Sequence, residues 1–201
     1  MKRLMFAIAL LATLPSGVLA AQPDIGDFFD RFTAEWVRAD PQLATASQYF
    51  SGEEQAKLDA QLTPVGAKNI RERVERARRG LAELRRFDRK RLTASQQVSA
   101  RVLEWQLDSI VRAERFSGHS YLFNQGIAGL PGTLVRFLTE IHSARNPRDV
   151  ENYLARLGQL APRLDETIVE AHARAARGHR TAPLYPDGNH RPDRTSRGAG
   201  T

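Results

Sequence analysis

The fold is decided by residues 63–110, which read TPVGAKNIRERVERARRGLAELRRFDRKRLTASQQVSARVLEWQLDSI. The first half predicts a helix that Thr63-Pro64 opens and that runs to about Phe87. Its apolar side chains recur at helical spacing, at Ile70, Val74, Ala77, Leu81 and Leu84. One such stripe is typical of a helix that packs on a core through a single face.

The second half predicts another long helix, which begins at a capping box formed by Thr93 and Gln96. We expect a wider apolar face here, made of Val98, Val102, Trp105, Leu107 and Ile110. Because only a short polar turn joins the two helices, they should pack as an antiparallel hairpin.

Towards the N-terminus, three further helix starts are visible. Asp24 is the predicted cap of a helix with Phe28, Phe29, Phe32 and Trp36 at helical spacing. Asp40 followed by Pro41 is the second start, since proline is tolerated in a first turn. Ser51 and Glu54 have the spacing of a capping box and mark the third.

Towards the C-terminus, residues 117–131 interrupt the helical period. A short helix is expected next, with Leu134, Val135, Leu138 and Ile141 facing inward. Asn146-Pro147 caps the last helix, where Val150, Tyr153, Leu154, Leu157, Leu164 and Ile168 align. Pro162 predicts a kink or break between Gly158 and Pro162. Since no segment alternates like a strand, the fold class is all-α, an arrangement of antiparallel helical hairpins or a bundle.

The N-terminus predicts a secretory signal peptide over residues 1–20. Two basic residues precede an apolar run from Leu4 to Leu14, and small residues lead to a cleavage site near Ala20. The run is shorter than the roughly 20 residues that span a bilayer. The chain contains no cysteine, so it can carry neither a lipoprotein anchor attached through cysteine nor a disulfide. We expect a periplasmic or secreted protein without a stable membrane anchor after cleavage, and one helical domain over residues 21–177.

The last residues, 178–201, read GHRTAPLYPDGNHRPDRTSRGAGT and have lost all helical periodicity. Rich in Gly, Pro and Arg, they offer too little apolar surface to offset the entropy of ordering, so we predict a disordered tail.

Charge and motifs restrict the function classes. The formal net charge is +7, but part of it lies in the predicted leader and tail. The basic segment Lys68–Arg91 fits either an anionic-surface site or, as we prefer, a solvated helix face with internal ion pairs. The chain contains five histidines and no pair with H-E-x-x-H spacing. The sequence also contains no G-x-S-x-G pattern and no serine whose neighbours suggest an activating base. The sequence thus predicts no catalytic residue, no metal ligand, no cofactor in this chain and no nucleic-acid partner.

One loop remains as a candidate site. His119, Asn124 and Gln125 lie in a glycine-rich apolar stretch, where polar amides can line a pocket and hold a substrate backbone. The alternative is that these groups satisfy the buried backbone of the loop itself.

Several ordered patterns resemble a bacterial family called domain of unknown function 885. They are Asp27-Phe-Phe-Asp-Arg-Phe-x-x-Glu-Trp36, His119-x-Tyr-Leu-Phe-Asn-Gln125-Gly126, Asn146-Pro-x-Asp-Val-Glu-Asn-Tyr-Leu154 and Ala173-Arg-Ala-Ala-Arg-Gly178. The resemblance implies a mostly helical, exported protein related to zinc metallopeptidases, with a peptide as substrate of the intact protein. It also implies a zinc motif, H-E-x-x-P-G-H-H, which this sequence lacks, so zinc is expected only in a full-length family protein.

The resemblance suggests a chain truncated before the zinc motif, with a one-base frameshift near codon 178 as the origin of the tail. Three hypotheses follow. The first is an N-terminal helical fragment of a metallopeptidase-like protein, inactive alone and of marginal stability. The second is a short periplasmic binding module for a peptide or envelope partner. The third is a basic protein that binds anionic polymer or lipid through Lys68–Arg91.

Overall fold

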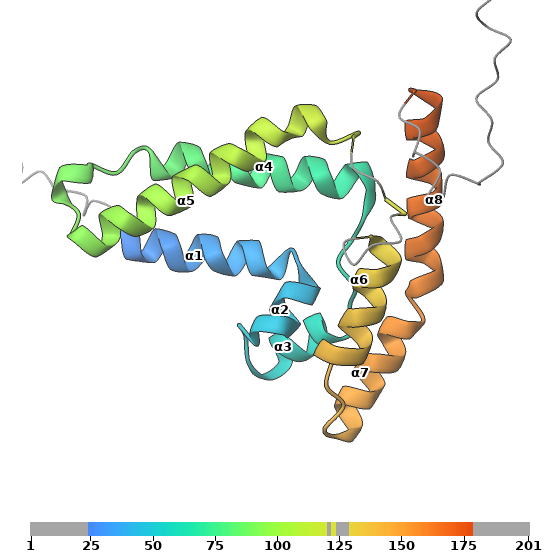
Figure 1. Cartoon of the computed structure of the whole chain (residues 1–201). Helices are drawn as coiled ribbons and strands as arrows, with labels where there is room; N and C mark the ends of the chain where they lie inside the picture. The colour runs from blue at the N-terminus through green and yellow to red at the C-terminus, as the bar shows by residue number, and fades with distance from the viewer. Residues whose placement is uncertain (1–23, 120–121, 124–128, 179–201) are drawn as a thin grey trace, which may run out of the picture.

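The computed structural model describes residues 24–119, 122–123 and 129–178, and all regular structure in them is helical (Figure 1). The α-helices are α1 (Ile25–Arg38), α2 (Pro41–Ser47), α3 (Gly52–Asp59), α4 (Gly66–Leu84), α5 (Ala94–Ala113), α6 (Leu130–Arg136), α7 (Pro147–Leu157) and α8 (Leu160–Ala176). Short 3₁₀ turns cover Arg89–Arg91 and Glu114–Phe116. The all-α prediction is confirmed, whereas the predicted signal peptide and all but the first residue of the predicted tail lie outside the described residues.

Three helices form a long arm. The α4–α5 pair packs as the predicted antiparallel hairpin, and α1 lies along it (Figure 1). The buried core between them consists of Ile25, Phe28, Phe32, Ala77, Leu81, Leu84, Ala100 and Leu107. The aromatic spacing in α1 and the stripe on α4 therefore meet, as their periods predict.

The closest approach in this arm is between α1 and α4 at Gly80. The Phe32 ring lies so near the Gly80 backbone that a Cβ built there would be 2.2 Å from Phe32 Cε2 and 2.6 Å from Cζ. The ring has little room to retreat, because Phe32 stacks on Phe28 and also contacts Trp36. Glycine is therefore required at this position by packing.

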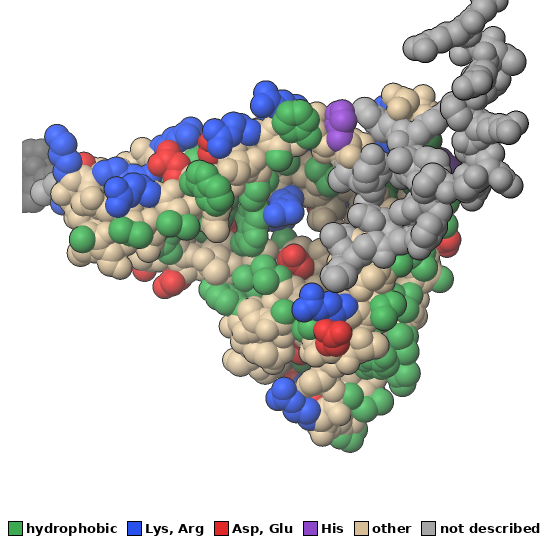
Figure 2. Space-filling view, in the orientation of Figure 1, with side chains coloured by type: hydrophobic (Ala, Val, Ile, Leu, Met, Phe, Trp, Pro, Cys, Tyr) green, Lys and Arg blue, Asp and Glu red, His purple; other side chains and the backbone are tan. Residues whose placement is uncertain are grey.

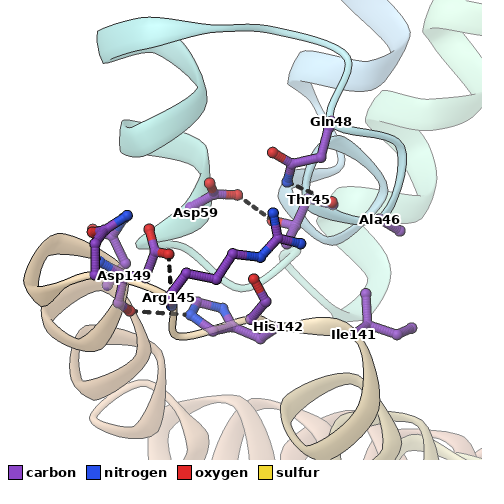
Figure 3. A pocket seen from close by; sticks show the side chains of 11 residues that line it. Thr45, Ala46, Gln48, Asp59, Ile141, His142, Arg145 and Asp149 are labelled. Carbon is purple, nitrogen blue, oxygen red and sulfur yellow. Dashed lines mark hydrogen bonds between the residues drawn. The ribbon is translucent and has the colours of Figure 1, made fainter.

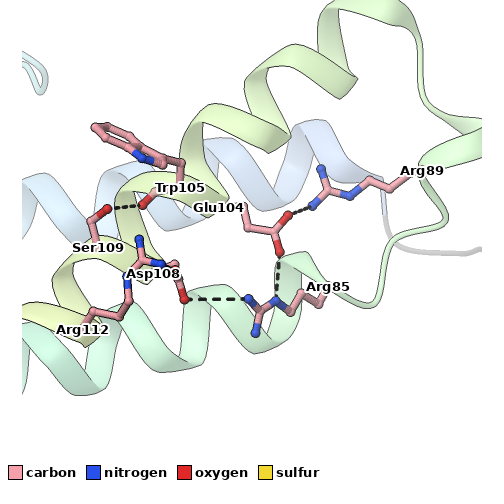
Figure 4. A network of polar contacts seen from close by, with 7 residues as sticks. All are labelled: Arg85, Arg89, Glu104, Trp105, Asp108, Ser109 and Arg112. Carbon is pink, nitrogen blue, oxygen red and sulfur yellow. Dashed lines mark hydrogen bonds and ion pairs between the residues drawn. The ribbon is translucent and has the colours of Figure 1, made fainter.

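The prediction for the apolar face of α5 is wrong at three positions. Val98, Val102 and Trp105 are 51, 50 and 67 % exposed, while Leu107 is buried together with Ala100. The physical reason is that α5 meets the core through the neighbouring stripe of Ala100, Leu103 and Leu107. Beside this stripe, Glu104 accepts hydrogen bonds from Arg85 and Arg89, both at 2.9 Å. Figure 4 shows Trp105 pointing away from this ion-pair network.

A second group of helices lies at the other end of the molecule, where α6 and α7 stand beside α2 and α3, and α8 contacts α4 (Figure 1). Its apolar core contains Leu62, Leu134, Phe137 and Leu138. Val135 and Ile141 were expected inside but are 62 and 39 % exposed. Val135 lies off the face that Leu134, Phe137 and Leu138 bury at helical spacing. Ile141 continues that spacing, but it lies in a π-helical turn over Phe137–Ile141, closed by the His142 N–H donating to the Phe137 carbonyl at 2.8 Å, and the wider turn rotates it outward.

The last predicted helix is broken as expected, because α7 ends at Leu157 and α8 begins at Leu160. Most of its predicted apolar residues, however, do not form the buried face. Val150, Leu154, Leu157 and Ile168 are between 37 and 59 % exposed, and the fully buried residues are Arg156, Thr167 and Arg174. The α7–α8 pair thus packs inward through these polar side chains together with Tyr153 and Leu160, which contact the apolar core.

Most predicted caps are present. Asp24, Asp40, Thr93 and Asn146 each accept a backbone N–H of the helix that follows, and Thr93 and Gln96 form the complete box. The box at Ser51 is wrong, because Ser51 makes no side-chain cap bond and Glu54 accepts from Arg38 Nε at 2.7 Å. The start at Thr63 is also wrong, since α4 begins at Gly66 and the Thr63 hydroxyl donates to Asp40.

No helix within residues 24–119 and 129–178 has both the length and the apolar character needed to cross a bilayer.

Candidate functional site

The candidate site is built around Arg156, a fully buried arginine on α7. Its side chain reaches from α7 to the C-terminal ends of α2 and α3. The Nε–H donates to the Gln61 carbonyl at 2.9 Å, and Nη2 donates to the Leu58 carbonyl at 3.0 Å. The guanidinium carbon lies 4.7 Å from the centre of the Phe137 ring. Burial lowers the pKa of Arg156 to about 10, so the guanidinium remains charged at neutral pH.

Several carbonyls at the end of α3 and just beyond it accept hydrogen bonds from residues at the α7–α8 junction. Besides Arg156, the Gln159 side chain donates to the Ala60 carbonyl at 2.7 Å and accepts the Leu62 N–H at 2.9 Å. A helix end leaves such carbonyls unsatisfied unless a partner is supplied. Side chains far away in sequence therefore fix the position of α3 against α7.

A second hydrogen-bonded chain runs from Arg156 through α2. Arg156 Nη2 donates to the Thr45 hydroxyl at 2.5 Å, and this hydroxyl donates to Asp59 Oδ1 at 2.6 Å. Gln55 Nε2 donates to the same carboxylate oxygen at 2.9 Å. Both side-chain hydrogen bonds that Asp59 accepts from described residues thus end on Oδ1, and Asp59 also lines the adjoining cavity.

His142 completes the buried network and its tautomer follows from its partners. Arg156 Nη1 can only donate, so the hydrogen-bonded His142 Nδ1 must be an unprotonated acceptor. The opposite nitrogen, Nε2, lies 3.2 Å from the Asp149 carbonyl oxygen and carries the proton. Burial and then the Arg156 charge lower the pKa of His142, while the bond to the Asp149 carbonyl opposes this shift. A neutral imidazole protonated at Nε2 is therefore the form that matches both hydrogen-bond partners.

Next to the network lies a polar cavity of about 340 Å³ (Figure 3). Its wall combines hydrogen-bond acceptors with donors from four elements. The side chains that matter for binding are Gln48, Asp59, His142, Arg145, Asp149 and Asn152. Arg145 extends across the cavity towards α2 in Figure 3, and its backbone N–H donates to Asp149 Oδ2 at 2.9 Å. The cavity is large enough for a small ligand and suits one with mixed polar groups.

The His142 tautomer gives a pH prediction. Because the pKa of His142 in the folded chain lies below that of the unfolded chain, the native state binds fewer protons between these two values. The free energy of unfolding should be highest above about pH 6.5 and fall progressively as the pH drops below it. Protonated Nδ1 would confront the Arg156 guanidinium. Urea unfolding at a series of pH values measures this slope.

The variant for this test is His142→Gln, since an amide can accept from Arg156 and donate to the Asp149 carbonyl. Its stability should lose the dependence on pH in that window, and a His172→Gln chain controls for the loss of one histidine. An unchanged slope in His142→Gln would contradict the assignment.

The predicted loop site is described only in part. His119 is exposed, and its ring makes an edge contact with Phe116, with ring centres 6.1 Å apart. Asn124 and Gln125 lie outside the described residues, so their role as substrate-binding residues stays a prediction. The network around Arg156 does not include His119.

The basic segment Lys68–Arg91 is largely an ion-paired helix face. Arg31 pairs with Glu83 at 2.5 Å, Arg79 with Glu35 at 2.7 Å, and Arg78 with both Glu75 and Glu114. These partners reduce the charge available to an anionic polymer.

The zinc chemistry that the resemblance implies has no ligand set in this part of the chain. Among the described residues, no three His, Asp or Glu side chains lie close enough together to hold a metal ion. His142, the one buried histidine there, uses both ring nitrogens within the protein.

Sequence reasoning missed Arg156 and His142. One signal was present, because Arg156 lies between Tyr153 and Leu160, both of which turn partly inward, at the spacing of a core-facing position. An arginine at such a position indicates a buried polar network, since a buried charge needs several partners.

Comparison with known families gives a match to one, described as a bacterial protein of unknown function (DUF885), over residues 41–186. No curated protein and no solved structure matches the chain. The matched region contains α2 to α8 and every residue of the network around Arg156. Because this match spans well over half of the sequence, the chain belongs to the DUF885 family.

Proposed function

We propose that the cavity between α2, α3 and the start of α7 binds a short peptide, and that the chain supplies this binding surface to an exported protein related to metallopeptidases. The observation that carries the proposal is that the Asp59 and Asp149 carboxylates and Arg145 line one polar cavity. A cavity lined only by acceptors or only by donors would select a simple ion. This one has both kinds of group, which a peptide backbone can match.

The chemistry favours a particular orientation of the peptide. An ammonium or amide N–H group can donate to the Asp59 carboxylate, while a carbonyl or carboxylate accepts from the Arg145 guanidinium. Asn152 and Gln48 add amide groups at the edge of the same cavity. The Arg156 network holds the Asp59 carboxylate in place, so the acceptor is positioned before the ligand arrives.

The role proposed here for the described residues is binding, not hydrolysis. It is compatible with both the metallopeptidase-like fragment and the binding module that the sequence suggests. The class of ligand, a peptide, is taken from the family resemblance. The residues proposed to bind it are those that line the cavity.

The test is a titration of the full chain with trialanine, in which binding is measured by calorimetry and by amide chemical shifts. Arg145→Gln should weaken binding by at least about tenfold, since a hydrogen bond to a charged group contributes about 1.5–3 kcal/mol. Arg145 is exposed and makes its bond to Asp149 through the backbone, so the fold should be retained. Arg71→Gln, an exposed arginine on α4, is the matched control.

N-acetylated trialanine lacks the ammonium group but keeps the carboxylate, so it tests the two ends of the peptide separately. Weaker binding of the acetylated peptide places the ammonium group against Asp59 or Asp149. Equal affinity of Arg145→Gln and the unchanged chain, or shifts confined to residues away from α2 and α7, would contradict the proposal.

A further inference from the structure

An exposed apolar face runs along α7 and continues onto α8. Figure 2 shows hydrophobic side chains gathered along the outer edge of this pair. The exposed members are Val150 (45 %), Leu154 (59 %), Leu157 (37 %), Ile168 (42 %) and Val169 (68 %). Such a continuous apolar surface is unusual on a helix whose inner face is already packed.

The spacing of this face is that of a helix–helix interface. Val150, Leu154, Leu157, Ala161, Leu164 and Ile168 follow one another at alternating steps of four and three residues. This heptad pattern places side chains in one row for packing against another helix. It passes through the Gly158–Gln159 break, where both residues keep backbone angles near the right-handed helical region.

The flank of the α7–α8 face is acidic. Glu151 and Asp165 directly follow the row positions Val150 and Leu164, and both are exposed. In a heptad, these positions border the contact and choose the partner by charge. The preferred partner is therefore an apolar helix face with basic borders.

The chain itself carries such a face on α5. Val98, Val102 and Trp105 repeat the four-then-three spacing and are all at least half exposed. Arg101 lies one turn from both Val98 and Trp105 and is exposed. Arg112 lies in the same row beyond Trp105 and pairs with Asp108 at 2.8 Å. The α5 face is thus apolar with an exposed arginine at its border, which complements the acidic flank of the α7–α8 face.

We propose that the partner is a second copy of this chain, with the α5 face of one copy packed on the α7–α8 face of the other. The two faces lie on different helices of one chain, so the contact is head-to-tail and joins unlike surfaces. Charge complementarity selects this pairing over α5 on α5 or α7–α8 on α7–α8, since each of those would bring like charges together.

The experiment uses two charge-reversed full chains in sedimentation velocity. One carries Arg101→Glu, and the other carries Glu151→Arg with Asp165→Arg. The unchanged chain should show an average mass that at least doubles as its concentration is raised. Each reversed chain alone should remain monomeric, because its two faces then carry like charges.

An equimolar mixture of the two reversed chains should associate again, since every cross-contact restores opposite charges. Arg71→Glu, which reverses an exposed charge on α4 and alters neither face, should associate like the unchanged chain. A chain that stays monomeric at all concentrations would overturn the proposal. So would association of the single reversed chains, or a mixture that does not recover, because these results indicate contact through another surface.

Discussion

Arg156→Met is expected to lower the free energy of unfolding by about 3–5 kcal/mol, the largest loss among the changes considered. Methionine fills much of the volume and removes the cost of burying a charge. It cannot donate to the Leu58 and Gln61 carbonyls, however, and it leaves the Thr45 hydroxyl and His142 without their donor. Unsatisfied buried groups cost about 1–3 kcal/mol each, which exceeds the gain from removing the charge. Urea unfolding followed by circular dichroism measures the change.

The control for this variant is Arg148→Met on the same helix. Arg148 is exposed and pairs with Glu53 through bonds of 2.8 and 2.6 Å, so its loss should change stability little because surface pairs are screened by water. Arg156→Lys should fall between the two, since lysine keeps the charge and loses the planar set of donors. Equal stability of Arg156→Met and Arg148→Met would mean that the buried network contributes nothing.

Gly80→Ala is expected to destabilise the chain by about 2 kcal/mol, although alanine is the better helix former by about 1 kcal/mol. The new Cβ would lie 2.2 Å from Phe32 Cε2, well inside contact distance, so the ring or the helix must move. The stacked Phe28 ring resists that movement, with ring centres 5.6 Å apart. Steric strain therefore outweighs the propensity gain, and thermal and urea unfolding should both show the loss.

A double change tests this cause. In Phe32→Leu the ring is gone, so adding Gly80→Ala to that chain should cost much less than it does alone and can even restore stability. The coupling between the two sites is the difference of these costs in a double-mutant cycle. If the two losses simply add, then the contact with Phe32 is not what makes Gly80 necessary.

Much of the fold follows from the sequence because it depends on local signals. Asp24, Asp40, Thr93 and Asn146 cap their helices through side chains two or three residues from the N–H groups that they accept. The α4–α5 hairpin follows from two long amphipathic helices and a short turn. These features need no knowledge of distant partners.

The inward faces were harder to predict because distant partners decide them. Val102 and Trp105 have the right spacing for a core, yet α5 meets the core through Ala100 and Leu107, next to the Glu104 ion pairs. Ile141 is turned outward by a π-helical turn that hydropathy does not encode. Apolar spacing identifies a face, but it does not say which of two available faces will meet the core.

The candidate site was missed for a related reason. Arg156 and His142 look like surface residues in a local window, and the partners that bury them come from α2 and from the end of α3. A motif search looks for catalytic or metal-ligand spacing, and this network has neither.

The bonds between the α7–α8 junction and the end of α3 have a consequence for the order in which the chain folds. They join residues that are 95 to 99 positions apart, as in Arg156 with Gln61 and Gln159 with Ala60. Closing such long loops costs conformational entropy before the contacts between their ends can form, and this cost slows folding. The α1–α4–α5 arm uses no residue beyond α5, so it can form before α7 and α8 dock. The α2–α3 pair packs on α1 through Val37, Ala44 and Leu58, but its bonds to Arg156 and Gln159 close later, so the cavity is among the last parts of the molecule to be completed.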